Sequence, residues 1–351
     1  MLDCRSVNCL KSQEMAAIEK AKSSADKGKL LEIKHMAERY VPLDIGSGQT
    51  SFWLFYLPDF TNIFRDWYCR YTAGIIETYK TNAHACIHRS AEYFLLKYCG
   101  QRPKELVLKK LEENPKWIYD LISEVHKSEA DCSRELWKFE NNLKNSSAPD
   151  VAELIDKVNN FAAYGLDNVF PENYFVKKFP FAYLSGLYPN NLSSWLMIWE
   201  KAVTCLDAVY NKEKTEGQAA QEIADISYLR WGDMESKEDD LKFAQRYMGR
   251  LKISFPNWFS ICDYREKKKE DERINLNLSR HISYANEISA QMNANDKEIF
   301  KSMAYFACES IAYNEKRRIN FTKCLRLLRD YCEQRDIDWR VARLEDLVLN
   351  N

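Results

Sequence analysis

An acidic, glycine-containing motif near residue 44 has the composition of a cofactor-binding turn. The apolar residues before Asp44 predict a strand, Gly46 and Gly48 follow it, and the apolar run 52–57 predicts a helix. Glycine tolerates positive φ and lets the backbone approach a ligand closely. The N–H groups at the start of a helix attract a polar or anionic group. The motif therefore predicts a turn that binds a nucleotide-like cofactor, with an ordinary tight turn as the alternative.

Glu77 is the residue expected to complete such a site. Sites for dinucleotides or S-adenosylmethionine usually carry an acid beyond the glycines that binds the ribose hydroxyls. Glu77 ends the apolar run 73–76, as this role requires. The alternative is that Glu77 is a surface residue within one long helix over 59–98.

Two asparagines and a phenylalanine follow the apolar run 154–158, which is itself a predicted strand. The amides of Asn159 and Asn160 are suited to holding a polar ligand, and Phe161 is suited to forming the wall of a narrow channel. Methyl transfer to an amine needs such a channel, because the amine must meet the sulfonium of S-adenosylmethionine in line. An asparagine-rich turn is the alternative.

Four motifs, in this order, resemble the disruptor-of-telomeric-silencing family, the non-SET histone lysine methyltransferases. The resemblance covers residues 40–195, and its motifs are Asp44-Ile-Gly-Ser-Gly, Gly74-Ile-Ile-Glu77, Val158-Asn-Asn-Phe-Ala162 and Phe179-Pro-Phe-Ala-Tyr-Leu184 with Asn191-Leu-Ser193. It departs from the family at Thr50, which replaces the third glycine of the loop, and over 100–157, where this chain has added helix.

The resemblance implies a methyltransferase that uses S-adenosylmethionine. It assigns Asp44, Gly46 and Gly48 to the cofactor site and Glu77 to the ribose. Asn160 and Phe161 would shape the methyl-transfer site. The substrate would be a protein lysine in the histone core of the nucleosome, which implies a nuclear chromatin regulator.

The corresponding fold is α/β, with a Rossmann-like core of seven strands and large helical additions. The predicted parts are an N-terminal helical segment (1–37), a methyltransferase-like domain (38–262) with a helical insertion (108–150), and a C-terminal helical domain (276–351). The predicted strands lie at 40–44, 73–77, 104–108, 154–158, 226–231 and 251–255, with a further one at 258–262.

The competing prediction is a mainly α-helical bundle that serves as a protein-interaction or scaffold protein. This class includes a methyltransferase relative that has lost its activity. The glycine motif would then connect two helices. The strand content separates the two predictions.

Composition restricts the class of protein and of partner. The chain has 351 residues, 46% of them apolar, and a net charge of −1, which predicts a globular protein without a general attraction to nucleic acid. The basic runs 267–269 and 316–318 are short and flanked by acids. Direct binding of nucleic acid is therefore predicted to be weak or absent.

The eleven cysteines are scattered and include no Cys-x-x-Cys pair. They predict free thiols in a reducing intracellular compartment, which is the cytoplasm if the family resemblance fails. No apolar run is long enough to span a membrane, so no membrane partner is predicted. His84 and His88 have a spacing that suits two metal ligands, but no third ligand accompanies them, and no metal site is predicted.

Overall fold

The computed structural model of the chain is mainly helical. The structure describes residues 40–44, 50–56, 61–80, 84–89, 93–99, 103–145, 149–180, 194–230, 235–275, 286–290 and 292–349. The chain divides into two compact units, each built from separate stretches of sequence. The first unit contains 1–110, 128–169 and 330–351, and the second contains 111–127 and 170–329.

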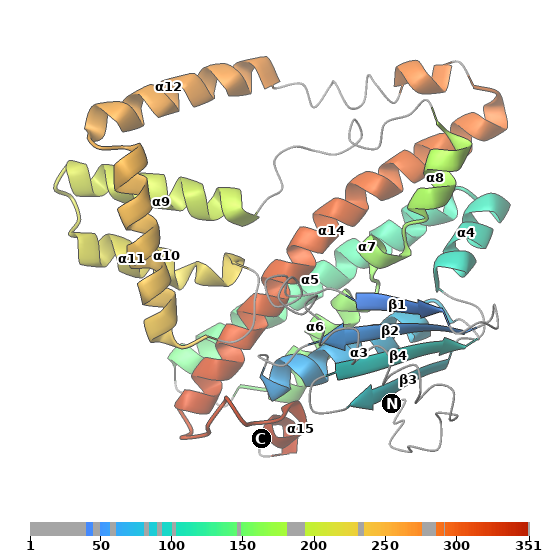
Figure 1. The fold of residues 1–351 in the computed structure, drawn as a ribbon, viewed down its shortest axis with the longest axis horizontal. Coiled ribbons are helices and arrows are strands. Elements are labelled where there is room, and N and C mark those ends of the chain that lie inside the picture. The colour runs from blue at the N-terminus through green and yellow to red at the C-terminus, as the bar shows by residue number, and fades with distance from the viewer. Residues whose placement is uncertain are drawn as a thin grey trace. The chain divides into compact units, whose positions relative to one another are not determined.

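A four-stranded antiparallel sheet belongs to the first unit (Figure 1). Its strands, in the order β1-β2-β4-β3, are β1 (Tyr40–Asp44), β2 (Thr50–Tyr56), β4 (Tyr93–Cys99) and β3 (His84–Arg89). Every neighbouring pair is antiparallel, and Asp44 of β1 pairs with Ser51 of β2. β1 and β2, which precede and follow the glycine motif in the sequence, are therefore paired strands.

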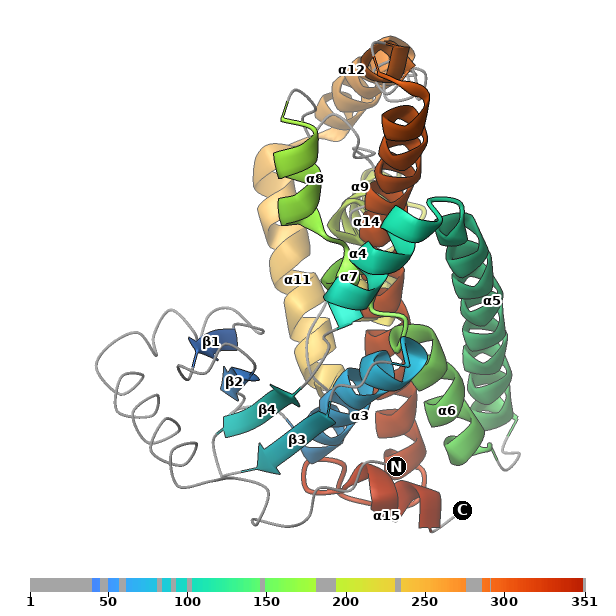
Figure 2. The ribbon, with the colours of Figure 1, turned by 90° about the vertical axis from the view of Figure 1, so that its right-hand side faces the viewer.

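The described helices that lie wholly in the first unit are α3 (Asn62–Thr78), α6 (Val151–Ala162), α7 (Leu166–Val169) and α15 (Leu344–Leu349), which are labelled in Figure 2. The side chains of Thr61 and Asp150 accept hydrogen bonds from backbone N–H groups at the starts of α3 and α6. Such caps satisfy donors that have no partner within the helix. Helix α3 packs against α6, and this pair carries several of the residues that the sequence singled out.

Three helices continue across the boundary between the units: α4 (Pro103–Glu113), α5 (Trp117–Lys144) and α14 (Ala294–Glu333). In α5 the buried apolar residues recur at spacings of three, four or seven positions, which places them on one face of the helix. They are Ile118, Leu121, Ile122, Val125, Cys132, Leu136, Phe139 and Leu143. This pattern explains why the sequence predicts helix over 108–145, a prediction that the structure confirms.

The second unit contains α8 (Glu172–Lys178), α9 (Ser194–Tyr210), α10 (Glu216–Asp225), the short 3-10 helix η4 (Ser227–Leu229), α11 (Lys237–Ser254) and α12 (Trp258–Asn275). One core joins α9 to α12 and includes Leu206, Ile223, Met248, Phe255 and Ile261. A separate group of aromatic side chains joins α8 to α14 and comprises Phe170, Phe175, Phe179, Phe300 and Phe306.

The prediction of a seven-stranded Rossmann-like core is wrong. Residues 73–77 lie in α3, 104–108 in α4, and 154–158 in α6. Residues 251–254 end α11, 258–262 begin α12, and 226–231 contain η4. A short apolar run fits a buried strand and a buried turn of helix equally well, so its period does not separate the two. The alternative of a mainly helical protein agrees with the structure.

The alternative of one long helix over 59–98 is also wrong beyond Thr78, because 84–89 and 93–99 are strands β3 and β4. His84 and His88 therefore lie on a strand. Within the described part of the chain, no helix is both long and apolar enough to cross a membrane. The predicted segment 1–37 lies outside the described residues, and the other predicted domain boundaries stay predictions.

Candidate functional site

Of the predicted cofactor residues near the N-terminus, the structure describes only Asp44. Asp44 is the last residue of β1, and Gly46 and Gly48 fall outside the described residues. The chain continues after them as strand β2, where the predicted site required the first turn of a helix. A strand does not direct a row of free N–H groups at a bound anion as a helix N-terminus does.

The other predicted site residues lie on α3 and α6. Glu77 is exposed in the last turn of α3. Phe161 is 1% exposed and belongs to the core, while Asn160 is exposed and donates a hydrogen bond to Asp156 over 3.0 Å. Asn159 is partly buried, and its Oδ1 has no hydrogen-bond partner among the described residues.

Two of the motifs do come together, but as the crossing of two helices. A Cβ at Gly74 would lie 2.8 Å from the Cβ of Ala163, so α3 and α6 approach closely at this point. Gly165 has a positive φ of 50°, and a Cβ there would lie 2.6 Å from Cδ1 of Ile75. The Tyr79 hydroxyl donates to the carbonyl of Tyr164 over 2.6 Å. Packing of α3 against α6 and the turn after it therefore explains why these residue types occur at these positions.

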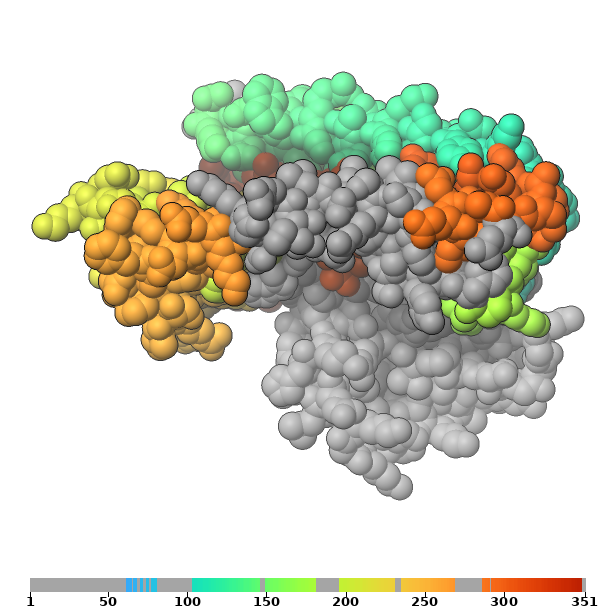
Figure 3. Space-filling view, turned by 90° about the horizontal axis from the view of Figure 1, so that it is seen from above, coloured from blue at the N-terminus to red at the C-terminus, as the bar shows by residue number. Residues whose placement is uncertain are grey.

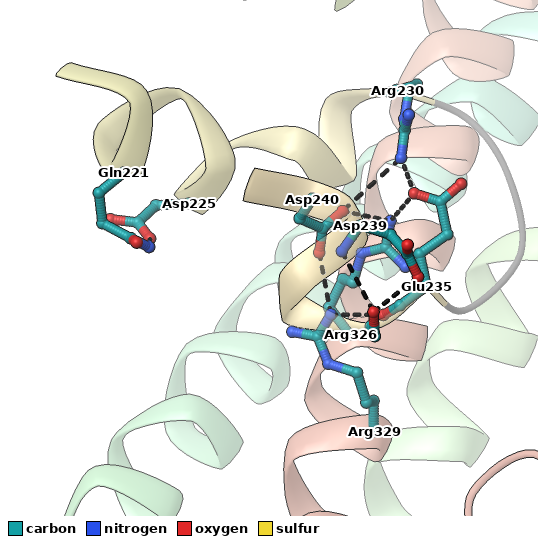
Figure 4. Close-up of polar contacts among 9 residues, drawn as sticks. Gln221, Asp225, Arg230, Glu235, Asp239, Asp240, Arg326 and Arg329 are labelled. Atoms are coloured by element: carbon teal, nitrogen blue, oxygen red, sulfur yellow. Dashed lines mark hydrogen bonds and ion pairs between the residues drawn. The ribbon is translucent and has the colours of Figure 1, made fainter. Parts of the chain in front are cut away.

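The second unit contains a buried cluster of arginines and carboxylates, drawn in Figure 4. Asp240, in the first turn of α11, accepts hydrogen bonds from Arg326 and Arg329 of α14, each over 2.9 Å. Glu235 forms ion pairs with Arg230 and Arg326, and its backbone carbonyl accepts from Arg329 over 2.6 Å. The side chains of Asp240, Arg326 and Arg329 are at most 8% exposed.

This arginine–carboxylate cluster positions helices. Burial, and then the positive charge of Arg326, lower the pKa of Arg230, while Asp240 opposes the shift. The guanidinium of Arg230 also lies 4.3 Å from the centroid of the Phe243 ring. Arginine stays protonated in proteins, so the cluster fixes the start of α11 against α14 by charge and geometry.

The turn between α11 and α12, which we name the α11–α12 corner (residues 253–259), is firmly held from beneath. Buried Phe255 packs its ring against Trp199 and Tyr264, and its carbonyl accepts from the Tyr210 hydroxyl over 2.5 Å. Asn257 caps α12, because its side chain accepts from the N–H of Ser260 over 3.1 Å. Figure 1 shows α11 and α12 meeting at this corner.

Three large apolar side chains project from the α11–α12 corner into solvent. Ile253 is 83% exposed, Phe259 71% and Trp258 42%. The rings of Trp258 and Phe259 meet edge to face, with centroids 5.4 Å apart. In the space-filling view of Figure 3, the light orange atoms of α12 lie on the surface that faces the viewer. Exposed apolar clusters of this kind mark binding surfaces.

The sequence interpretation missed this corner because it assigned 251–255 and 258–262 to strands. The available signal was Asn257, which directly follows Pro256 and precedes Ser260 by three residues. This pattern is typical of a helix start that follows a chain turn. The arginine–carboxylate cluster left no such signal, because Asp240 and Arg326 are far apart in the sequence.

Comparison of the chain with known protein families, with curated proteins and with solved structures gives no match.

Proposed function

We propose that this protein is a helical protein-interaction protein that docks through the α11–α12 corner. The observation that carries the proposal is the exposure of Ile253, Trp258 and Phe259 on a turn whose backbone is fixed by the core. Aromatic side chains are among the residues that contribute most to binding when a partner covers them.

The rigidity of the corner favours binding over incidental exposure. A flexible turn loses conformational entropy when a partner orders it, and this loss weakens binding. Here Phe255 and Asn257 already hold the backbone, so the exposed side chains are presented in one arrangement. A partner that covers them gains apolar burial at about 25 cal/mol per Å² with little ordering cost.

Methyl transfer to a protein lysine stays a prediction from the resemblance. The described residues of the predicted methyltransferase site lie at a strand end and on two packed helices. They are Asp44, Glu77, Asn159, Asn160 and Phe161. No observation in the described part of the chain favours S-adenosylmethionine or a histone as ligand, so the interaction function is the better supported of the two.

The test compares two exposed-surface variants in binding to proteins from the native cells. In the first variant, Ile253→Ser and Phe259→Ser remove the apolar corner. In the control variant, Val341→Ser removes an apolar side chain that is 66% exposed in the other unit. Some partners will bind the purified wild-type and control proteins directly. We expect these partners not to bind the corner variant. Equal binding of all three proteins would refute the proposal.

A further inference from the structure

The α11–α12 corner is flanked by charges of opposite sign. On α11, Arg246, Arg250 and Ile253 are exposed and spaced four and three residues apart, which places them along one face. The two arginines have no ion-pair partner among the described residues. Their side chains leave a basic stripe that runs roughly 10 Å along the helix and ends in the apolar corner.

The same spacing recurs on α12 with the charge reversed. Phe259, Asp263 and Glu266 are exposed and also spaced four and three residues apart. Neither acid has an ion-pair partner in the described part of the chain. An acidic stripe therefore begins at the apolar corner and runs along α12, with exposed Lys267 beside its far end.

Four other cations near the corner are neutralised within the protein. Lys242 pairs with Glu238, Lys252 with Glu216, Arg265 with Asp207 and Lys268 with Glu200, at 2.5–2.6 Å. Among the described residues around the corner, the charges left for a partner are thus mainly the basic stripe on one side and the acidic stripe on the other.

We propose that the occupant of this surface is a second copy of the same chain, in a two-fold symmetric dimer. In such a contact the basic stripe of one copy meets the acidic stripe of the other, and symmetry forms the same contact twice. The apolar corners meet at the centre, where Ile253, Trp258 and Phe259 of both copies are covered. This inference rests on the proposed interaction function and names its partner.

Charge polarity favours a second copy over an anionic membrane surface or an acidic protein. A surface of one sign attracts one stripe and repels the other, so the two contributions largely cancel. A second copy supplies both signs in the required order. Complementary charges of this kind mainly set which partner binds and how fast, while apolar burial at the centre supplies affinity.

The dimer is expected to be reversible. Specific stable interfaces bury about 800 Å² on each partner, and one corner with two short stripes gives a surface at the small end of that range. We expect a dissociation constant of about 1–100 µM, which rises with salt because the stripes are exposed to solvent.

The decisive experiment reverses each stripe separately and then combines the variants, with the mass measured by analytical ultracentrifugation over a concentration series. The basic-stripe variant carries Arg246→Glu and Arg250→Glu, and the acidic-stripe variant carries Asp263→Lys and Glu266→Lys. Each alone sets like charges against each other, and we expect its dimer to weaken at least tenfold. An equimolar mixture restores both contacts in a heterodimer, and one chain that carries all four changes restores the homodimer.

A control variant with Lys297→Glu and Lys301→Glu reverses two cations at the same spacing on α14 and is expected to dimerise as the wild type does. Circular dichroism establishes that each variant is folded. A wild type that stays monomeric across the series, or a mixture that fails to restore dimers, overturns the self-association. If partner binding still depends on Ile253 and Phe259 in that case, the proposed function stands, and charged vesicles then test a membrane partner. If it does not, both proposals fail.

Discussion

At the scale of single residues, two glycines have opposite roles that the structure makes testable. Gly165 adopts a positive φ next to Ile75, whereas a Cβ at Gly249 on α11 would meet nothing within 4 Å. We expect Gly165→Ala to lower the free energy of unfolding by at least about 1 kcal/mol, through backbone strain and overlap with Ile75. Gly249→Ala should raise it by up to about 1 kcal/mol, because alanine favours the helix. Urea denaturation of both variants checks the pair, and a neutral Gly165→Ala would contradict the close approach.

Asp240 is the residue on which the arginine–carboxylate cluster depends most. Replacing it with asparagine leaves the charges of Arg326 and Arg329 without their shared buried carboxylate. We expect a loss of about 3–5 kcal/mol in the free energy of unfolding. Glu238→Gln is the control, since Glu238 lies on the same helix turn but is 75% exposed, and we expect a change within about 0.5 kcal/mol. Equal effects of the two substitutions would show that the cluster contributes nothing particular to stability.

At the scale of elements, Glu222 of α10 links this helix to Lys201 of α9 and to Lys214 in the preceding turn. Hydrogen bonds from Lys201 (2.7 Å) and Lys214 (2.5 Å) lower the pKa of Glu222 from 4.5 to about 2. Below pH 4.5 the unfolded chain binds a proton that the folded protein does not. The stability from this group is therefore complete above pH 4.5 and is lost as the pH falls toward 2.

The corresponding variant is Glu222→Gln. We expect it to be less stable than the wild type at neutral pH, with a difference that shrinks steadily on acidification and vanishes near pH 2. Denaturant unfolding at several pH values measures this difference. A difference that stays constant with pH would mean that the carboxylate charge contributes nothing.

The elements also show where sequence patterns suffice. Long amphipathic patterns predict α5 and most of α14 correctly, because many residues report the same helical period. The short runs of five or six residues that were predicted as strands are not reliable in the same way, and six of the seven lie in helix or turn in this protein. The pair of β1 and β2 was missed because its second strand has no polar alternation over Phe52–Tyr56.

At the scale of the whole molecule, the helical fold bears on the predicted cofactor. We expect calorimetry to detect no binding of S-adenosylmethionine tighter than about 1 mM. We expect Phe161→Ala to cost about 3–5 kcal/mol of stability, as for a core phenylalanine, and Glu77→Ala to change stability by less than about 0.5 kcal/mol. Micromolar binding of S-adenosylmethionine that both Gly46→Arg and Glu77→Ala abolish would contradict the expected lack of binding and restore the methyltransferase prediction.

The sequence by itself determined the long helices, the globular character and the lack of a described helix that could cross a membrane. These depend on composition and on periodicity within one segment. Only the tertiary structure decided that Gly74 meets Ala163, that Asp240 joins Arg326 and Arg329, and that Ile253, Trp258 and Phe259 stay exposed. The physical reason is that each of these depends on what packs against a residue from a distant part of the chain. Residues with the same local pattern become core, contact or binding surface according to that neighbour.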